Sequence, residues 1–188
     1  MKRLLIGVPV ALALALPLPV AAQADAKTDK TNAAQECRAE RGSTAATREA
    51  FRVRYGTNAN GRNAFGKCVS RRAKAEARQK AAAATNAAKQ CKAERAQLGE
   101  AAFAAKYGSG KKGKNAYGQC VSQKAKANKD AADKADAKAI AKRTSAAKTC
   151  AAERKADPAA FKAKYGTNRN KANAFGKCVS STAKKVRS

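Results

Sequence analysis

Cysteine is the residue type with the most definite chemistry in this sequence of 188 residues. The six cysteines form pairs separated by 31, 29 and 28 positions: Cys37 with Cys68, Cys91 with Cys120, and Cys150 with Cys178. An even number of cysteines in an oxidising compartment is best explained by disulfides, and this pairing is the most economical because each repeated unit then closes in the same way. Each closure should stabilise the fold by about 3 to 4 kcal/mol. The alternative is a zinc site, but two cysteines per unit and no histidine fall short of a closed tetrahedral ligand set.

Basic residues gather before and within a repeated octet, which reads NAFGKCVS at 63–70 and 173–180 and NAYGQCVS at 115–122. The first Asn of each octet is a favourable helix N-cap. Cationic side chains beside a helix N-terminus, where free N–H groups and the helix dipole favour negative charge, indicate anion binding. The alternative is that any loop of so lysine-rich a chain contains lysine. The candidate anion-binding residues are Arg62, Lys67, Lys111, Lys112, Lys114, Arg169, Lys171 and Lys177.

Residues suited to catalysis are scarce. There is no histidine, and the cysteines are expected to be oxidised. The acids that recur, Glu40, Glu94 and Glu153, occur once per unit, whereas paired acids for glycoside chemistry must share one cleft. We interpret these glutamates as ion pairs or caps that steady a helix, and we predict no enzymatic activity, no cofactor and no metal.

The elements that position these residues repeat, because the chain contains three copies of one unit. Each copy opens with a Cys-bearing segment, continues through an aromatic pair four residues apart that is followed by Gly, and closes with the octet. We expect a first helix that begins at Asn32, Asn86 or Ser145, a second that ends at the Gly in a left-handed C-cap, and a third that begins at the octet Asn.

Nine aromatic residues are the only large side chains available to fill the three copies. They fall at matched positions, and we predict that they form cores rather than a stacking surface for nucleic acid. They are Phe51, Tyr55 and Phe65; Phe103, Tyr107 and Tyr117; and Phe161, Tyr165 and Phe175.

Two Ala/Lys-rich linkers, 73–85 and 125–144, separate the copies and contain neither Gly nor Pro. We expect the third helix of one copy to continue through the linker into the next copy. Isolated Ala-rich helices of this length are marginal in water, so a linker that frays in the middle is equally compatible with the sequence. The linkers have no apolar stripe beyond Ala, so packing into a core is not expected. The fold class predicted is all-α: three tandem, small, disulfide-stapled helical modules at 31–72, 86–124 and 145–186, joined by helical linkers and extended rather than globular.

Residues 1–24 combine a positive start, an apolar run and small residues at the end, which is typical of a cleaved secretory signal peptide. We therefore expect a protein that is secreted or extracytoplasmic, at the cell surface or in the periplasm. Removing Lys2 and Arg3 leaves 39 basic residues against 13 acidic ones, a net charge of +26.

A surplus of this size exceeds what solubility requires and favours contact with polyanions. The hypothesis is a secreted, strongly basic repeat protein that binds polyanions non-specifically and multivalently, whether cell-wall polymer, acidic polysaccharide or extracellular nucleic acid. The alternative is a structural spacer of the cell envelope with protein partners. A membrane-active or antimicrobial protein is a weaker alternative, because the linkers supply no large apolar face.

Overall fold

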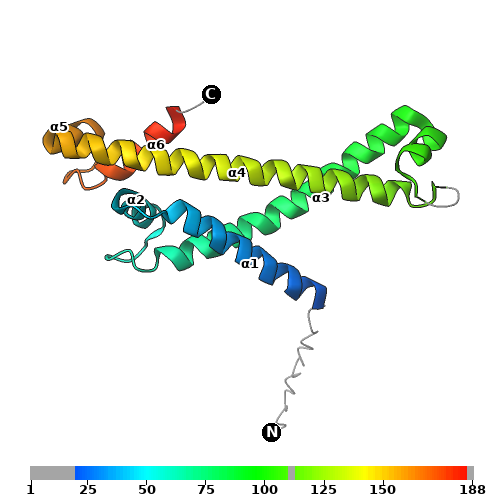
Figure 1. Cartoon of the computed structure of the whole chain (residues 1–188), viewed down its shortest axis with the longest axis horizontal. Helices are drawn as coiled ribbons and strands as arrows, with labels where there is room; N and C mark the ends of the chain where they lie inside the picture. The colour runs from blue at the N-terminus through cyan, green and yellow to red at the C-terminus, as the bar shows by residue number, and fades with distance from the viewer. Residues whose placement is uncertain (1–19, 110–112, 186–188) are drawn as a thin grey trace, which may run out of the picture.

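Figure 1 shows a computed structural model of the chain, whose structure is described for residues 20–109 and 113–185. Within these residues there are helices and no strands, so the all-α prediction is confirmed. The helices are α1 (Val20–Arg41), α2 (Ala45–Tyr55), α3 (Ala64–Tyr107), α4 (Ala116–Ala156), α5 (Pro158–Tyr165) and α6 (Ala174–Lys185). The expected signal peptide lies outside the described residues, except for its last five, which begin α1.

Three disulfides close the copies with the predicted pairing. Cys37 joins Cys68, Cys91 joins Cys120 and Cys150 joins Cys178, each with a Cα–Cα distance of 6.0 Å. All six cysteine side chains are completely buried. Each disulfide ties the first helical segment of a copy to its third, so the second segment is held against both.

Both linkers are helical throughout, as predicted. The long helices α3 and α4 each combine the last segment of one copy, a linker and the first segment of the next copy. Consequently Asn86 and Ser145 lie inside helices and cap nothing, and α1 begins well before Asn32. The second segment of copy 2 is the last part of α3, set off from the rest by a kink at Gly99, where the backbone is not helical (φ 77°).

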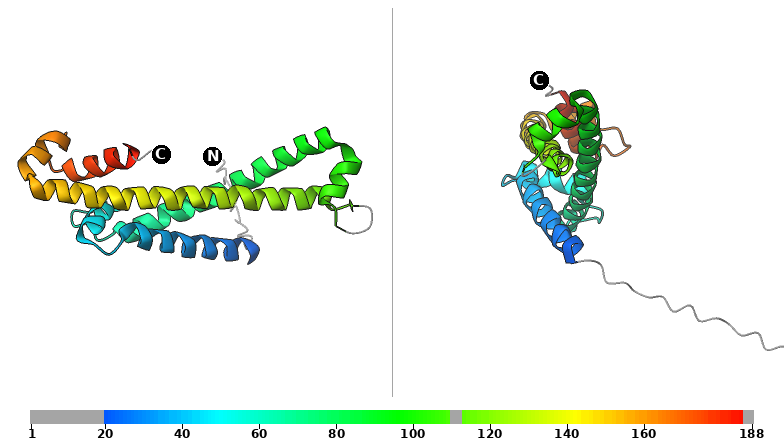
Figure 2. Two further views of the ribbon diagram at one scale, coloured as in Figure 1. Left: turned by 45° about the horizontal axis from the view of Figure 1, so that its top comes forward. Right: turned by 90° about the vertical axis from the view of Figure 1, so that its right-hand side faces the viewer.

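The extended arrangement predicted for the copies is wrong. Helices α3 and α4 cross and pack together, and α1 packs against both. Figures 1 and 2 show copies 1 and 3 side by side at one end of the molecule and the bend of copy 2 at the other end. We expected no packing because the linkers lack an apolar stripe of large side chains. The helices instead meet through buried alanines, Ala83 and Ala87 among them, and through polar pairs.

These polar pairs join α3 to α4 across the crossing. The Glu76 carboxylate is almost fully buried and lies 2.8 Å from the Lys129 ammonium. Gln79 donates a hydrogen bond to Asp136 at 2.8 Å. Alanine lets the two backbones approach closely enough for such short contacts, so a linker without large apolar side chains can still pack.

The octet Asn closes a loop instead of capping its helix through the side chain. Asn63 accepts a hydrogen bond from the backbone N–H of Thr57 at 3.1 Å and donates one to its hydroxyl at 2.6 Å. Asn115 makes the same two bonds with Ser109, and Asn173 makes them with Thr167. All three loops are therefore held shut by one repeated side-chain contact.

The Gly that follows each second helix does not adopt the left-handed conformation that we expected. Gly56 has φ −66°, and a Cβ there would lie 2.6 Å from the Arg52 carbonyl oxygen. The residue is glycine because the loop returns closely over the helix end. The left-handed position lies further along each loop, at Gly61, Gly113 and, in copy 3, the non-glycine Lys171.

The aromatic residues form the cores, with one exception. Phe51, Phe103 and Phe161 are at most 3% exposed, and each packs against the Tyr four residues later with ring centroids about 5 Å apart. Tyr117 is the exception at 39% exposed, and its hydroxyl donates to the Ala88 carbonyl at 3.2 Å.

Candidate anion-binding sites

The recurring glutamates link the first two helical segments of every copy. In each copy the Tyr of the aromatic pair donates a hydrogen bond from its hydroxyl to the glutamate, at 2.9 Å for Glu40, 2.9 Å for Glu94 and 3.0 Å for Glu153. The residue before that Tyr adds an ion pair, which is Arg54, Lys106 or Lys164. The glutamates thus act structurally, but their partners lie on the second segment rather than at the adjacent arginine.

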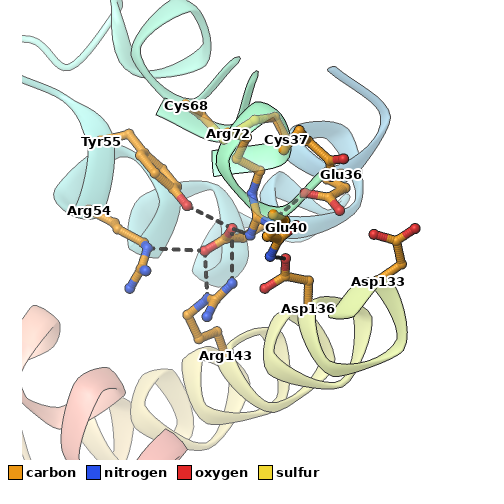
Figure 3. Close-up of polar contacts among 12 residues, drawn as sticks. Glu36, Cys37, Glu40, Arg54, Tyr55, Cys68, Arg72, Asp133, Asp136 and Arg143 are labelled. Carbon is orange, nitrogen blue, oxygen red and sulfur yellow. Dashed lines mark hydrogen bonds and ion pairs between the residues drawn. A yellow bond between two sulfur atoms is a disulfide. The ribbon is translucent and has the colours of Figure 1, made fainter. Parts of the chain in front are cut away.

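Glu40 is the most enclosed of these glutamates, with a side chain only 4% exposed (Figure 3). Arg72 of α3 lies 2.9 Å from it, Arg143 of α4 lies 2.7 Å away and Arg54 of α2 lies 3.3 Å away. Burial would raise the pKa of Glu40, but hydrogen bonds from Arg143 and Arg72 outweigh burial and hold this pKa below its ordinary value. Glu40 therefore stays charged and joins three helices to α1.

A second ion pair joins copy 1 to copy 3. Arg154 of α4 donates two hydrogen bonds to the Glu49 carboxylate of α2, at 2.6 and 2.7 Å. The same guanidinium lies 4.5 Å from the ring centroid of Phe175. Because this contact and Arg143–Glu40 both originate on α4, that helix fixes the position of copy 3 against copy 1.

The predicted anion-binding residues are dispersed over three loops and the first turns of α3 and α6 rather than gathered in one site. Lys111 and Lys112 lie outside the described residues. Lys171 donates to the Gly166 carbonyl at 3.0 Å, so its ammonium group already helps to close the loop. The others, Arg62, Lys67, Lys114, Arg169 and Lys177, are exposed.

Arg62 belongs to a cluster that sequence reasoning missed. Around a hollow of about 200 Å³ lie four arginines, with Phe51, Phe65 and Ala64 in its lining. They are Arg41 at the end of α1, Arg48 and Arg52 on α2, and Arg62 in the loop, and all four are exposed. Among the described residues, no carboxylate forms an ion pair with any of them. We call this feature the arginine hollow. The spacing of four between Arg48 and Arg52 was the available sequence signal.

Copies 2 and 3 replace or neutralise the same positions. In copy 2 the residues equivalent to Arg41 and Arg48 are Arg95 and Glu100, which pair with each other. In copy 3 Pro158 occupies the place of Arg48, and Arg154, which matches Arg41, is bound to Glu49. Only copy 1 therefore combines four unpaired arginines within the described part of the chain.

Among the described residues, no group of His, Cys, Asp and Glu could hold a metal ion. The helices of that same part include none that is long and apolar enough to cross a membrane. Buried disulfides are typical of proteins in an oxidising compartment outside the cytoplasm. Comparison with family models, with curated proteins and with solved structures finds no match to this chain.

Proposed function

We propose that this protein binds polyanions through many weak electrostatic contacts and that the arginine hollow is its strongest contact point. The chain has 41 basic residues and 13 acidic ones, so even complete one-to-one pairing would leave a surplus of 28 positive charges. Multivalent binding converts many weak contacts into useful avidity when the ligand is long. Cell-wall polymer, acidic polysaccharide and extracellular nucleic acid are the candidate partners.

The arginine hollow is the observation that carries this proposal. Guanidinium groups form bidentate hydrogen bonds with phosphate, sulfate and carboxylate groups. Four such groups within one small hollow repel each other, and an anion relieves that repulsion. The matched positions in copy 2 are neutralised by an internal carboxylate, which shows that this fold does not require the charges.

The compartment proposed is the cell surface or the periplasm. Three buried disulfides support an oxidising environment, and the apolar segment at residues 1–24 supports export. Polymers rich in phosphate, sulfate or carboxylate are the anions that match the basic surface there.

A structural spacer with protein partners is the second candidate. The observation that favours it is the packing of α4 against two other helices, to α3 through the Lys129–Glu76 ion pair and to α1 through the Arg143–Glu40 ion pair. A spacer would keep its partners at high salt, whereas polyanion binding weakens steeply as salt rises because counterions are released on binding.

The test is a salt series on the oxidised, exported protein with duplex DNA, a sulfated polysaccharide and isolated cell wall. We expect submicromolar binding at low salt that collapses with salt, and a variant with Arg41, Arg48, Arg52 and Arg62 changed to Gln should bind at least about tenfold more weakly. The matched control changes Lys89, Lys92, Lys148 and Lys155 to Gln, which removes the same charge from exposed, unpaired positions. Equal losses in the two variants would remove the special role of the hollow, and no binding at low salt would refute the function.

A further inference from the structure

A larger groove of about 600 Å³ lies where copy 1 meets copy 3, between α2, α4 and α6. We call it the inter-copy groove. Its volume lies within the roughly 300 to 1,000 Å³ that is typical of small-molecule sites. It exists only because α4 holds the two copies together, so no single repeat predicts it.

Apolar side chains from three helices line the groove. Val53 of α2, Ala139 and Ala147 of α4, and Val179 and Ala183 of α6 line it. Val53 is 53% exposed, the most exposed of the large hydrophobic side chains in the described residues. Its Cγ1 lies so close to Gly176 that a Cβ there would approach within 2.8 Å. This contact seats the two helices against each other and leaves the rest of the Val53 side chain facing the groove.

Basic side chains line the same groove. Lys142, Lys177 and Lys184 line it, and none of them forms an ion pair among the described residues. The only acidic residue in the lining is Glu40, whose charge is already matched by three arginines. The uncompensated charge of the groove is therefore positive, and it stands beside an apolar wall.

We propose that the inter-copy groove binds a single-chain amphipathic anion, with its aliphatic tail along the Val53 wall and its carboxylate, sulfate or phosphate head on the three lysines. A purely polar anion would leave the apolar wall uncovered, and a neutral apolar ligand would desolvate the lysines without compensation. Lysine suits such a head group because its flexible stem covers the tail while its ammonium reaches the anion. This site is distinct from the arginine hollow and does not depend on polyanion binding.

The first test is calorimetric titration of the full, oxidised protein with straight-chain carboxylates of six to twelve carbons, each below its micelle concentration. We expect Kd to fall by about two- to fourfold per added methylene until the groove is filled. The alcohol of the same length should bind at least about tenfold more weakly, and acetate should not bind. Alkyl sulfates and alkyl phosphates tell which head group is preferred. Binding that is independent of chain length, or equal for the alcohol, would overturn the proposal.

Two variants locate the site. Val53→Asp places a negative charge on an exposed position of the apolar wall and should abolish decanoate binding while helicity is unchanged. Changing Lys142, Lys177 and Lys184 to Gln should weaken decanoate binding at least about tenfold more than it weakens octanol binding. The control variant, with Lys89, Lys92 and Lys148 changed to Gln, loses the same charge and should not show this difference. Equal weakening by both triple variants would overturn the proposal.

Two further outcomes separate the alternatives. If the ligand-free protein forms a dimer in light scattering that Val53→Asp dissociates, a second copy of the chain covers the groove and the proposal fails. DNA binding should persist within about twofold in Val53→Asp, since one exposed charge has a small effect on a multivalent contact. The arginine-hollow variant should lose DNA binding and keep decanoate binding, because it changes only the polyanion site.

Discussion

Copies 1 and 2 have a glutamate at equivalent positions, and in each copy the equivalent tyrosine donates a hydrogen bond to it, but the surroundings of the two glutamates differ. Glu40 receives Arg54, Arg72 and, from the distant helix α4, Arg143. Within the described residues, Glu94 forms ion pairs with Lys106 and Lys124 of its own copy and with no other cation, and its side chain is 17% exposed. The same contact thus joins four helices in copy 1 and is a local tie in copy 2.

The difference shows what a repeat specifies. The glutamate, its tyrosine and the cation before that tyrosine recur in every copy, so each copy can form this contact alone. Arg143 lies in the linker, outside the repeated unit, so no equivalent arginine recurs in each copy. Contacts within copies are set by the repeat, whereas contacts between copies use residues that do not recur, such as Arg143 of the linker and Glu49 of copy 1.

The largest expected effect tests this comparison directly. Glu40→Gln would leave three arginines around a neutral side chain, and we expect a loss of about 3 kcal/mol in the free energy of unfolding. Glu94→Gln, in a more exposed site, should cost markedly less. Urea denaturation of both variants at pH 7 measures the difference. Similar losses would mean that Arg143 adds nothing to the junction.

A second difference between the copies is Gly99, where α3 bends to form the second segment of copy 2. Gly99→Ala should cost about 1 to 3 kcal/mol because a side chain strains its left-handed backbone, although nothing lies within 4 Å of the site. Gly66, an unobstructed helical glycine in copy 1, is the control, and Gly66→Ala should stabilise by about 0.5 kcal/mol. Thermal unfolding checks both signs, and a neutral Gly99→Ala would show that copy 2 does not need the bend.

The smallest effect concerns acid. Hydrogen bonds from Lys106 and Lys124 lower the pKa of Glu94 to about 2 from an ordinary 4.5. Because the pKa in the folded state lies below that in the unfolded state, this stabilisation is complete above about pH 5 and is lost as pH falls towards 2. Glu94→Gln should therefore flatten the decline of stability between pH 5 and pH 2. The measurement is urea denaturation at several pH values, and an unchanged decline would contradict the assignment.

The sequence predicted the helical class, the disulfide pairing and the continuous linkers because each depends on local or repeated signals. Cysteine spacing, absence of Gly and Pro, and periodic aromatics are visible in one copy at a time. The packing of copy 1 on copy 3 was missed because it rests on Glu40 with Arg143 and on Glu49 with Arg154, pairs more than 100 residues apart in sequence. In a chain with so many basic residues, no sequence pattern predicts which arginine forms an ion pair with which acidic residue.

The candidate sites divide in the same way. The loop cations were visible beside their octets, but the arginine hollow needed the ends of α1 and α2 to meet one loop, and the inter-copy groove needed two copies to meet. The buried Phe51 is related to the arginine hollow, because a core residue brings its neighbours on the helix close to the Cys-bearing segment. Nothing of that kind indicates the inter-copy groove.

The unbroken helix between Cys68 and Cys91 also makes the molecule a ruler. At 1.5 Å per residue, these 23 residues of α3 set copies 1 and 2 about 35 Å apart along the helix axis. A flexible linker would let two copies engage a short ligand anywhere along its length. A rigid one gives the protein a length threshold for copy 2, since an oligomer shorter than this span cannot reach copy 2 from copies 1 and 3 and gains no avidity from it.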